Sequence, residues 1–419
     1  MPNTNNENDQ NKPFIKQTII EGKKDRNKKI ISVIGLAMLF GIIAGSSMTI
    51  TSYFLNKKLY HKKAQTTIEI PKEETDTDET KEEESSEQVE DIVASAIESI
   101  DIHLTEADLE KMYAGLIAVA DKKDSALVKI SVITTDTDWF NNTLKSENSC
   151  SGVVIANSDG NLIVLASDIS SEGDVKVEFF EGSVTDANIL GRDKLTDLMV
   201  LSVDISGLED NIKQIEPVNL GNSYQLRRGA FLIAVGSPNG RSQSIDIGNI
   251  TSIVKDADFF DGYGRVIYYD KHLESKGTFL LNTSGDLVGI ISNLDYGTSV
   301  SAAYGISDLK MLIENMTNGV GFAYLGVRAL NIDKEKAPEQ MPSGIYVAEV
   351  RAESPAYTTG IQSGDIITMI GDEEVDTVSE FKNIMEKLKP SQVINIKVSR
   401  SGKEGFTELN FETTIGARN

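Results

Sequence analysis

A continuous apolar stretch near the N-terminus, from Ile30 to Leu55, limits most strongly what this 419-residue chain can fold into. Only small and hydroxyl-bearing residues interrupt it, and its length exceeds the roughly 20 residues that a helix needs to cross a bilayer. A cleaved signal peptide would have a shorter apolar core and a small-residue cleavage site. The sequence therefore predicts an uncleaved transmembrane helix over residues 30–55.

Basic residues flank this stretch on both sides and are more numerous on the N-terminal side. Because positively charged segments tend to stay in the cytoplasm, we expect residues 1–29 to form a cytoplasmic basic tail. The domains after the helix would then lie outside the cell membrane, as the extracytoplasmic part of a single-pass protein. Cys150 is the only cysteine, so no intramolecular disulfide can form.

An acidic segment follows the apolar stretch. Between Glu69 and Asp91, twelve acidic residues face only two lysines, and the whole chain has a formal net charge of −23. Such a block repels itself and buries too little apolar surface to fold. We therefore expect a disordered acidic linker over residues 56–104, with an acidic binding tail as the alternative. The overall negative charge argues against nucleic acid as a partner.

Helical periodicity begins after this linker. Thr105 and Asp108 have the spacing of a capping box, which marks the start of a helix. Apolar residues then recur at helical spacing at Leu109, Met112, Leu116 and Ile117. The pattern predicts a short amphipathic helix from about residue 106 to 120 that packs on the next domain or on another subunit.

Short apolar segments separated by turn signals dominate from residue 125 onward. The predicted strands are 127–132, 152–155, 162–165, 175–179, 198–203, 231–235, 278–281 and 287–291. Many short strands at regular intervals indicate a sandwich or a barrel. One cysteine and three histidines cannot make a usual zinc site, and no glycine-rich phosphate loop follows a strand. We therefore expect neither a metal nor a cofactor.

A series of motifs in this strand-rich region carries a resemblance. The motifs are Ser151–Ile155 with Asp159-Gly160, Thr196–Leu201, Leu220–Ser223, Ala234–Gly240 and Gly248–Ser252. Together they resemble the HtrA/DegP family of trypsin-like serine proteases, and the similarity spans roughly residues 105–415. It implies a mainly β fold, with a trypsin-like double β-barrel over residues 105–318 and an α+β PDZ domain over residues 319–415.

A serine protease of this kind needs a nucleophilic hydroxyl, an imidazole base, an orienting carboxylate and backbone N–H donors for the oxyanion. Aligned with the family motifs, the carboxylate is retained as Asp197. Ser167 occupies the histidine position and Lys276 occupies the serine position. Glu274 and Thr278 replace the first and last glycines of the motif around Lys276. The resemblance therefore implies a catalytically degenerate member, a pseudoprotease.

Unconventional catalytic sites remain as alternatives. Ser275 could serve as a displaced nucleophile, alone or paired with His272, and Lys276 could act as the base of a Ser–Lys dyad with Ser167. In each alternative, either the general base is missing or the side chains are poorly placed for catalysis. With such a site, the chain would be an active endopeptidase that degrades misfolded surface proteins.

The last hundred residues resemble a PDZ domain. Tyr324-Leu325-Gly326-Val327 resembles the carboxylate-binding loop of HtrA-type PDZ domains, and Phe381 and Met385 belong to an apolar helical stripe. The resemblance implies that an extended C-terminal peptide adds a strand after this loop, with its carboxylate on the loop's N–H groups and its last side chain in an apolar pocket.

The expected function is therefore a membrane-anchored scaffold or quality-control adaptor that binds peptides. Its expected partners are C-terminal peptides or unfolded proteins. The family resemblance also implies a homo-trimer.

Overall fold

The computed structural model describes residues 67–73, 105–137, 143–169, 173–292, 294, 299–335, 337–338, 340–403 and 405–418. The predicted cytoplasmic tail and transmembrane helix, and most of the predicted acidic linker, lie outside these residues. Within them, no helix is long and apolar enough to cross a membrane.

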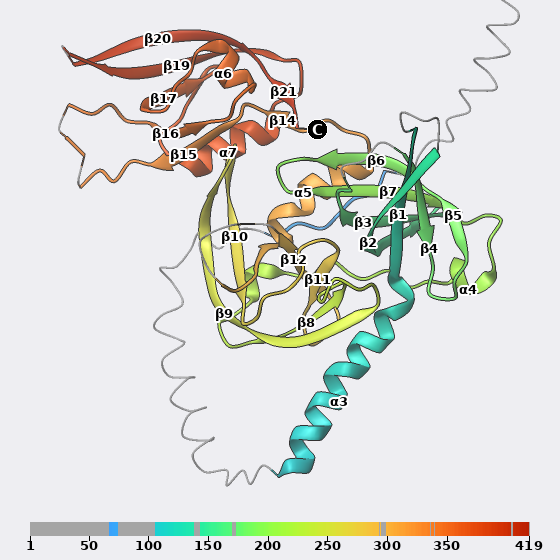
Figure 1. Cartoon of the computed structure of the whole chain (residues 1–419). Helices are drawn as coiled ribbons and strands as arrows, with labels where there is room; N and C mark the ends of the chain where they lie inside the picture. Colours follow the sequence, from blue (N-terminus) through green and yellow to red (C-terminus); the bar gives the residue numbers. More distant parts are fainter. Residues whose placement is uncertain are drawn as a thin grey trace, which may run out of the picture. The chain divides into compact units, whose positions relative to one another are not determined.

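Helix α3 (Glu106–Lys123) begins at the capping box that the sequence predicts (Figure 1). The Thr105 side chain accepts a hydrogen bond from the Asp108 N–H, and the Asp108 carboxylate accepts one from the Thr105 N–H. The helix runs three residues beyond the predicted end and leads through the 3-10 turn η1 (Asp124–Ala126) into the first strand. Apolar side chains exposed along it are Leu109, Met112, Tyr113 and Ile117.

The first half of the trypsin-like region is a seven-stranded antiparallel sheet in the order β5-β4-β1-β2-β3-β7-β6. Its strands are β1 (Leu127–Thr137), β2 (Thr143–Ser158), β3 (Asn161–Ser167), β4 (Asp174–Glu178), β5 (Val184–Asp186), β6 (Asn188–Asp193) and β7 (Leu198–Asp204). Two short helical segments, α4 (Asp210–Lys213) and η2 (Ser223–Gln225), then lead to the second half.

The second half is a closed six-stranded barrel in the order β10-β13-β12-β11-β8-β9. Its strands are β8 (Phe231–Gly236), β9 (Ser244–Phe259), β10 (Gly262–Tyr269), β11 (Thr278–Leu281), β12 (Leu287–Ser292) and β13 (Ala302–Gly305). The long β9–β10 hairpin is absent from the sequence prediction, because most β9 side chains are exposed or half-buried and show no regular apolar alternation.

One apolar core joins the two halves. It contains side chains from the first sheet, such as Val164 and Met199, together with side chains from the barrel, such as Phe279 and Ile290. Helix α5 (Ile306–Thr317) covers this core with five buried apolar residues, Ile306, Leu309, Leu312, Ile313 and Met316. The ends of strands from both halves therefore meet at one seam, where a trypsin-like active site would lie.

Residues 67–73 lie against α5, although they fall within the predicted disordered linker. Asn318 exchanges two hydrogen bonds with the backbone of Ile68, at 3.1 and 2.8 Å. Ile68 and Ile70 pack on the core, and Lys72 pairs with Glu314 at 3.1 Å. The expectation of disorder is wrong for these seven residues, because two alternating isoleucines give the segment an apolar face to bury.

The C-terminal region has a PDZ fold with a separate core. Its main sheet runs in the order β15-β16-β17-β19-β20, with β18 paired to β17, and β14 pairs with β21. The strands are β14 (Ala323–Tyr324), β15 (Val327–Asn331), β16 (Ile345–Val350), β17 (Asp365–Ile370), β18 (Glu373–Glu374), β19 (Val393–Gly402), β20 (Gly405–Thr414) and β21 (Gly416–Ala417). Its helices are α6 (Pro355–Thr359) and α7 (Val378–Lys387).

Candidate functional site

The three residues that the sequence assigns to the degenerate catalytic site come together in the structure. Ser167, Asp197 and Lys276 line one cavity of about 230 Å³. Ser167 ends β3 and pairs with Leu198 at the start of β7, so Asp197 lies beside it. Lys276 reaches the cavity from the turn that precedes β11.

Ser167 stands at the position that the catalytic histidine has in an active protease, and its side chain makes a hydrogen bond to the backbone. Its side chain is buried, and its Oγ accepts a hydrogen bond from the Gly277 N–H at 2.8 Å. The hydroxyl therefore ties the end of β3 to the turn that carries Lys276. A serine hydroxyl also accepts a proton far less readily than an imidazole does.

The turn around Lys276 directs backbone N–H groups into the protein. The Glu274 N–H donates to the Pro238 carbonyl at 3.0 Å, and the Gly277 N–H donates to Ser167. Gly277 has a φ of 75°, and a Cβ there would lie 2.4 Å from the Ser151 backbone nitrogen. An oxyanion hole needs N–H groups aimed at the substrate, whereas these two N–H groups point to acceptors within the protein.

Asp168 also lines the cavity, and the sequence reasoning missed it. Burial raises the pKa of the Asp168 carboxyl, the nearby Arg192 lowers it, and Asp197 raises it again. Arg192 Nε lies 3.5 Å from Asp168 Oδ1. A one-residue shift at the end of β3 would have placed Asp168 at the histidine position, which is the signal that could have found it.

None of the residues described around this cavity is a histidine. His272 is exposed and does not line it, whereas Ser275 does. The Cys150 thiol donates to the Ser167 carbonyl at 3.6 Å, and burial raises the pKa of this thiol to about 12. The cavity therefore offers carboxylates, an ammonium and hydroxyls, but no imidazole base. Among the described residues there is also no cluster that could hold a metal ion.

The second candidate site is the loop between β14 and β15. Leu325 and Val327 bury their side chains completely in the PDZ core, while Tyr324 is half-buried. Gly326 has a φ of 83°, and a Cβ there would lie 2.3 Å from the Ser354 Cβ. The loop can therefore offer its backbone N–H groups to a ligand, because its apolar side chains point inward.

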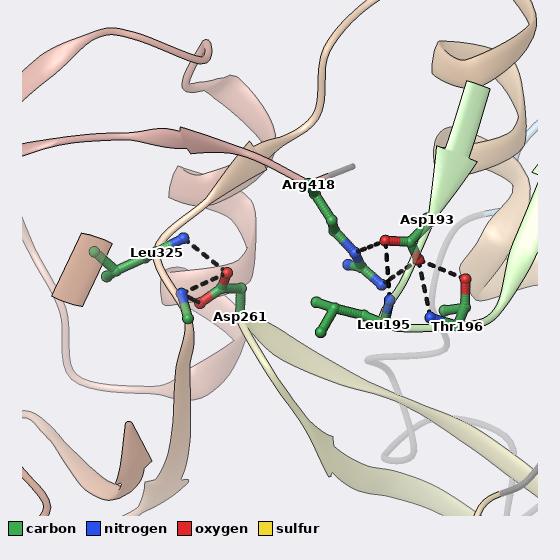
Figure 2. A network of polar contacts seen from close by, with 7 residues as sticks. Asp193, Leu195, Thr196, Asp261, Leu325 and Arg418 are labelled. Atoms are coloured by element: carbon green, nitrogen blue, oxygen red, sulfur yellow. Dashed lines mark hydrogen bonds and ion pairs between the residues drawn. The ribbon is translucent and has the colours of Figure 1, made fainter. Parts of the chain in front are cut away.

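These N–H groups converge on one carboxylate from the trypsin-like region, that of Asp261 (Figure 2). The Leu325 N–H donates to Asp261 Oδ2 at 2.8 Å, the Gly326 N–H to both oxygens at 2.9 and 3.0 Å, and the Val327 N–H to Oδ1 at 3.0 Å. The loop thus has the geometry of a carboxylate-binding site.

Phe381 and Met385 of α7 are almost completely buried in the PDZ core. Phe381 is therefore a packing residue. Met385 also lines a cavity of about 360 Å³ that includes Tyr263 of β10 and Arg328 of β15. Of the two predicted pocket residues, only Met385 borders open space beside β15.

Two family models match the chain. A trypsin-like peptidase domain matches residues 150–290, and a PDZ domain matches residues 323–411. Both matches agree with the folds described above. The class of protein is therefore a trypsin-like peptidase fold followed by a PDZ domain.

Similarity to known proteins identifies the family within this class. The serine endoprotease DegS of Haemophilus influenzae is 31% identical over 276 residues, which cover 63% of this chain and 76% of the relative. The serine protease Do-like HtrA of Bacillus subtilis is 28% identical over 333 residues, which cover 73% of this chain and 71% of the relative. The chain belongs to the HtrA family of serine proteases, which confirms the resemblance found in the sequence.

A solved structure shows the same fold. The HtrA-type protease AlgW with a decapeptide matches with a TM-score of 0.52 at 20% identity, over 73% of this chain and 99% of that one.

Proposed function

We propose that this chain is a pseudoprotease of the HtrA family that binds polypeptide termini through its PDZ domain without hydrolysing them. It acts as a scaffold or quality-control adaptor. Its ligands are C-terminal peptides and unfolded proteins with accessible ends.

The observation that carries the proposal is the turn around Lys276. A lysine stands at the nucleophile position, and the Glu274 and Gly277 N–H groups donate to acceptors inside the protein. Hydrolysis needs an activated oxygen, a base and oxyanion donors. The turn supplies none of these in the arrangement that the chemistry requires, and Ser167 at the base position is an acceptor for the turn itself.

Support for peptide binding comes from the loop between β14 and β15. Three consecutive N–H groups, from Leu325 to Val327, bind a carboxylate. Strand addition next to such a loop gives affinity through main-chain hydrogen bonds. The HtrA-type protease AlgW has been solved with a decapeptide, so a related fold binds a peptide.

The same proposal includes a location and an assembly. The apolar stretch over residues 30–55 anchors the chain in the cell membrane with its N-terminus in the cytoplasm and its domains outside. The chain assembles as a homo-trimer, for which the exposed apolar residues of α3 supply a contact surface. Analytical ultracentrifugation of the detergent-solubilised chain tests the assembly, and a monomeric mass would contradict it.

The test of the missing chemistry is labelling with a fluorophosphonate, which reacts with activated serines. We expect intact-mass spectrometry of the full chain to show no adduct under conditions that label trypsin completely. Ser275→Ala and Ser167→Ala are the matched variants. An adduct on either serine that disappears in the corresponding variant would show an active site and favour the endopeptidase alternative.

A further inference from the structure

The carboxylate loop of the PDZ domain is already filled by a side chain of the same protein. Asp261 lies at the tip of the β9–β10 hairpin and receives four hydrogen bonds from Leu325, Gly326 and Val327, all between 2.8 and 3.0 Å (Figure 2). Only 8% of its surface is exposed. Its carboxylate thus occupies the position that the terminal carboxylate of a bound peptide would need.

The hairpin tip also makes the main-chain contacts of an added strand. Phe260 pairs with Arg328 as an antiparallel bridge, and the Asp261 N–H donates to the Val327 carbonyl at 2.8 Å. These bonds use the outer edge of β15, which is the edge strand of the PDZ sheet. A peptide that adds a strand there would compete for the same backbone groups.

Side chains of α7 contact the hairpin next to its tip, at Tyr263. The Tyr263 hydroxyl lies 3.4 Å from Ser379 Oγ, and Lys382 Nζ donates to the Tyr263 carbonyl at 3.3 Å. The Lys382 ammonium also lies 4.8 Å from the centre of the Tyr263 ring. The tip therefore lies between β15 and α7, the two elements that border the predicted peptide site.

The loop presents three N–H donors to one carboxylate. The pKa of Asp261 is raised because burial outweighs the N–H groups of Val327, Gly326 and Leu325 and the charge of Arg418, which lower it. A buried carboxylate is costly unless it is fully hydrogen-bonded. The loop and the hairpin thus satisfy each other, and the three N–H groups cannot serve two carboxylates at once.

We infer that Phe260-Asp261 is an internal pseudo-ligand that closes the PDZ groove, so a C-terminal peptide binds only by displacing the hairpin tip. The inference rests on the proposed peptide capture. Because only the open fraction of molecules binds, the apparent affinity for a peptide is lowered by that fraction. Peptide arrival would also release the tip of a hairpin that belongs to the trypsin-like barrel.

Asp261→Asn in the full chain is the sharpest variant. Asparagine has the same size and tolerates the left-handed φ of 61° at this turn, so the hairpin is retained. It loses the charge and one of the two acceptor oxygens. Asp256→Asn is the matched control, because Asp256 is an exposed carboxylate on strand β9 of the same hairpin.

The first readout is fluorescence anisotropy with a labelled peptide that ends in an apolar residue and a free carboxylate. We expect Asp261→Asn to bind about tenfold more tightly or better than the wild type, and Asp256→Asn to match the wild type. The same peptide with a C-terminal amide should bind to none of them. Equal affinity of the wild type and Asp261→Asn would overturn the pseudo-ligand and leave peptide capture standing.

If neither the wild type nor any variant binds the peptide, the proposed peptide capture is refuted. Hydrogen exchange then still tests whether Asp261 occupies the loop. We expect the amides of Leu325 to Val327 to be protected in the wild type and to exchange about tenfold faster in Asp261→Asn. Equal exchange would overturn the inference. If Asp261→Asn does not fold, Lys382→Met loosens the tip from α7, leaves Asp261 in place and should change both readouts in the same direction.

Discussion

Ser167 and Lys276, which the sequence assigns to the histidine and serine positions of the catalytic site, line one cavity in the structure. The Ser167 hydroxyl accepts the Gly277 N–H at 2.8 Å, and Lys276 places an ammonium near the Asp168 and Asp197 carboxylates that line the same cavity. Burial has the largest effect on the pKa of Asp168 and raises it, as Asp197 does, whereas the positive charges of Arg192, Lys194 and Lys276 lower it. The Ser167 hydroxyl is thus bonded to the backbone of the turn, and Lys276 lies among carboxylates.

Ser167→Ala should destabilise the protein. It leaves the Gly277 N–H buried without its acceptor, which costs about 1 to 3 kcal/mol. Denaturant unfolding followed by circular dichroism measures the loss, with Ser206→Ala, at an exposed serine, as the control. A loss as small as that of the control would contradict the structural role of this hydroxyl.

The Cys150 thiol should be unreactive in the folded protein. Burial raises its pKa from 9.0 to about 12, so it stays protonated at pH 8, and iodoacetamide reacts with thiolates. The associated stability is present in full below pH 9 and is lost as the pH rises towards 12. Mass spectrometry should find alkylation at pH 8 only after unfolding in guanidinium. Rapid alkylation of the native chain would refute this environment.

The sequence motifs located Ser167, Asp197 and Lys276 well enough to place them around one cavity. Asp168 and Asp261 were missed for different reasons. Asp168 depends on a one-residue register at the end of a strand. Asp261 makes its contacts with residues more than sixty positions away, and no local pattern signals such a bond.

At the scale of elements, two local structures decide how the PDZ site works. The loop between β14 and β15 buries Leu325 and Val327, which turns its N–H groups outward. The β9–β10 hairpin then supplies the carboxylate of Asp261. The N–H groups of the loop and the carboxylate of the hairpin therefore satisfy each other's hydrogen bonds.

Gly326→Ala should damage the carboxylate loop. Alanine at a φ of 83° costs about 1 to 3 kcal/mol, and its Cβ would lie 2.3 Å from the Ser354 Cβ. We expect weaker binding of a free-carboxylate peptide and a lower melting temperature. Gly364→Ala is the control, since it has a similar positive φ but open space at its Cβ. Unchanged peptide binding in Gly326→Ala would contradict the role of this loop.

The capping box at Thr105 predicted the start of α3, because that signal is local. Strand β9 was not predicted, since its exposed polar side chains break the alternation that marks a strand. Residues 67–73 were assigned to the linker because the many acidic residues around them predict disorder, and two isoleucines alone are too weak a signal to predict packing.

At the scale of the whole molecule, a further polar contact joins the PDZ fold to the trypsin-like region. Arg418, after β21, makes two bonds to the buried carboxylate of Asp193, at 2.8 and 3.0 Å (Figure 2). Asp193 also accepts the N–H groups of Leu195 and Thr196, just before Asp197. Strand β21 is therefore tied to the segment that leads to Asp197, the carboxylate that the sequence assigns to the catalytic site.

Arg418→Ala should weaken this connection. The substitution removes the cation from a fully buried carboxylate, which costs about 3 kcal/mol of stability. This value is near the low end for breaking a buried ion pair, because the Leu195 and Thr196 N–H groups still donate to Asp193. Limited proteolysis should cut the chain faster between the two folds. Arg241→Ala, at an exposed arginine, is the control, and identical proteolysis of both variants would contradict the contact.

The proposed absence of turnover is tested most directly by incubating casein with the purified full chain and following the casein by mass spectrometry. We predict intact casein at all times, with no difference between the wild type and Ser275→Ala. Cleavage at defined bonds, at a rate proportional to the amount of chain and abolished by Ser275→Ala, would contradict the pseudoprotease account.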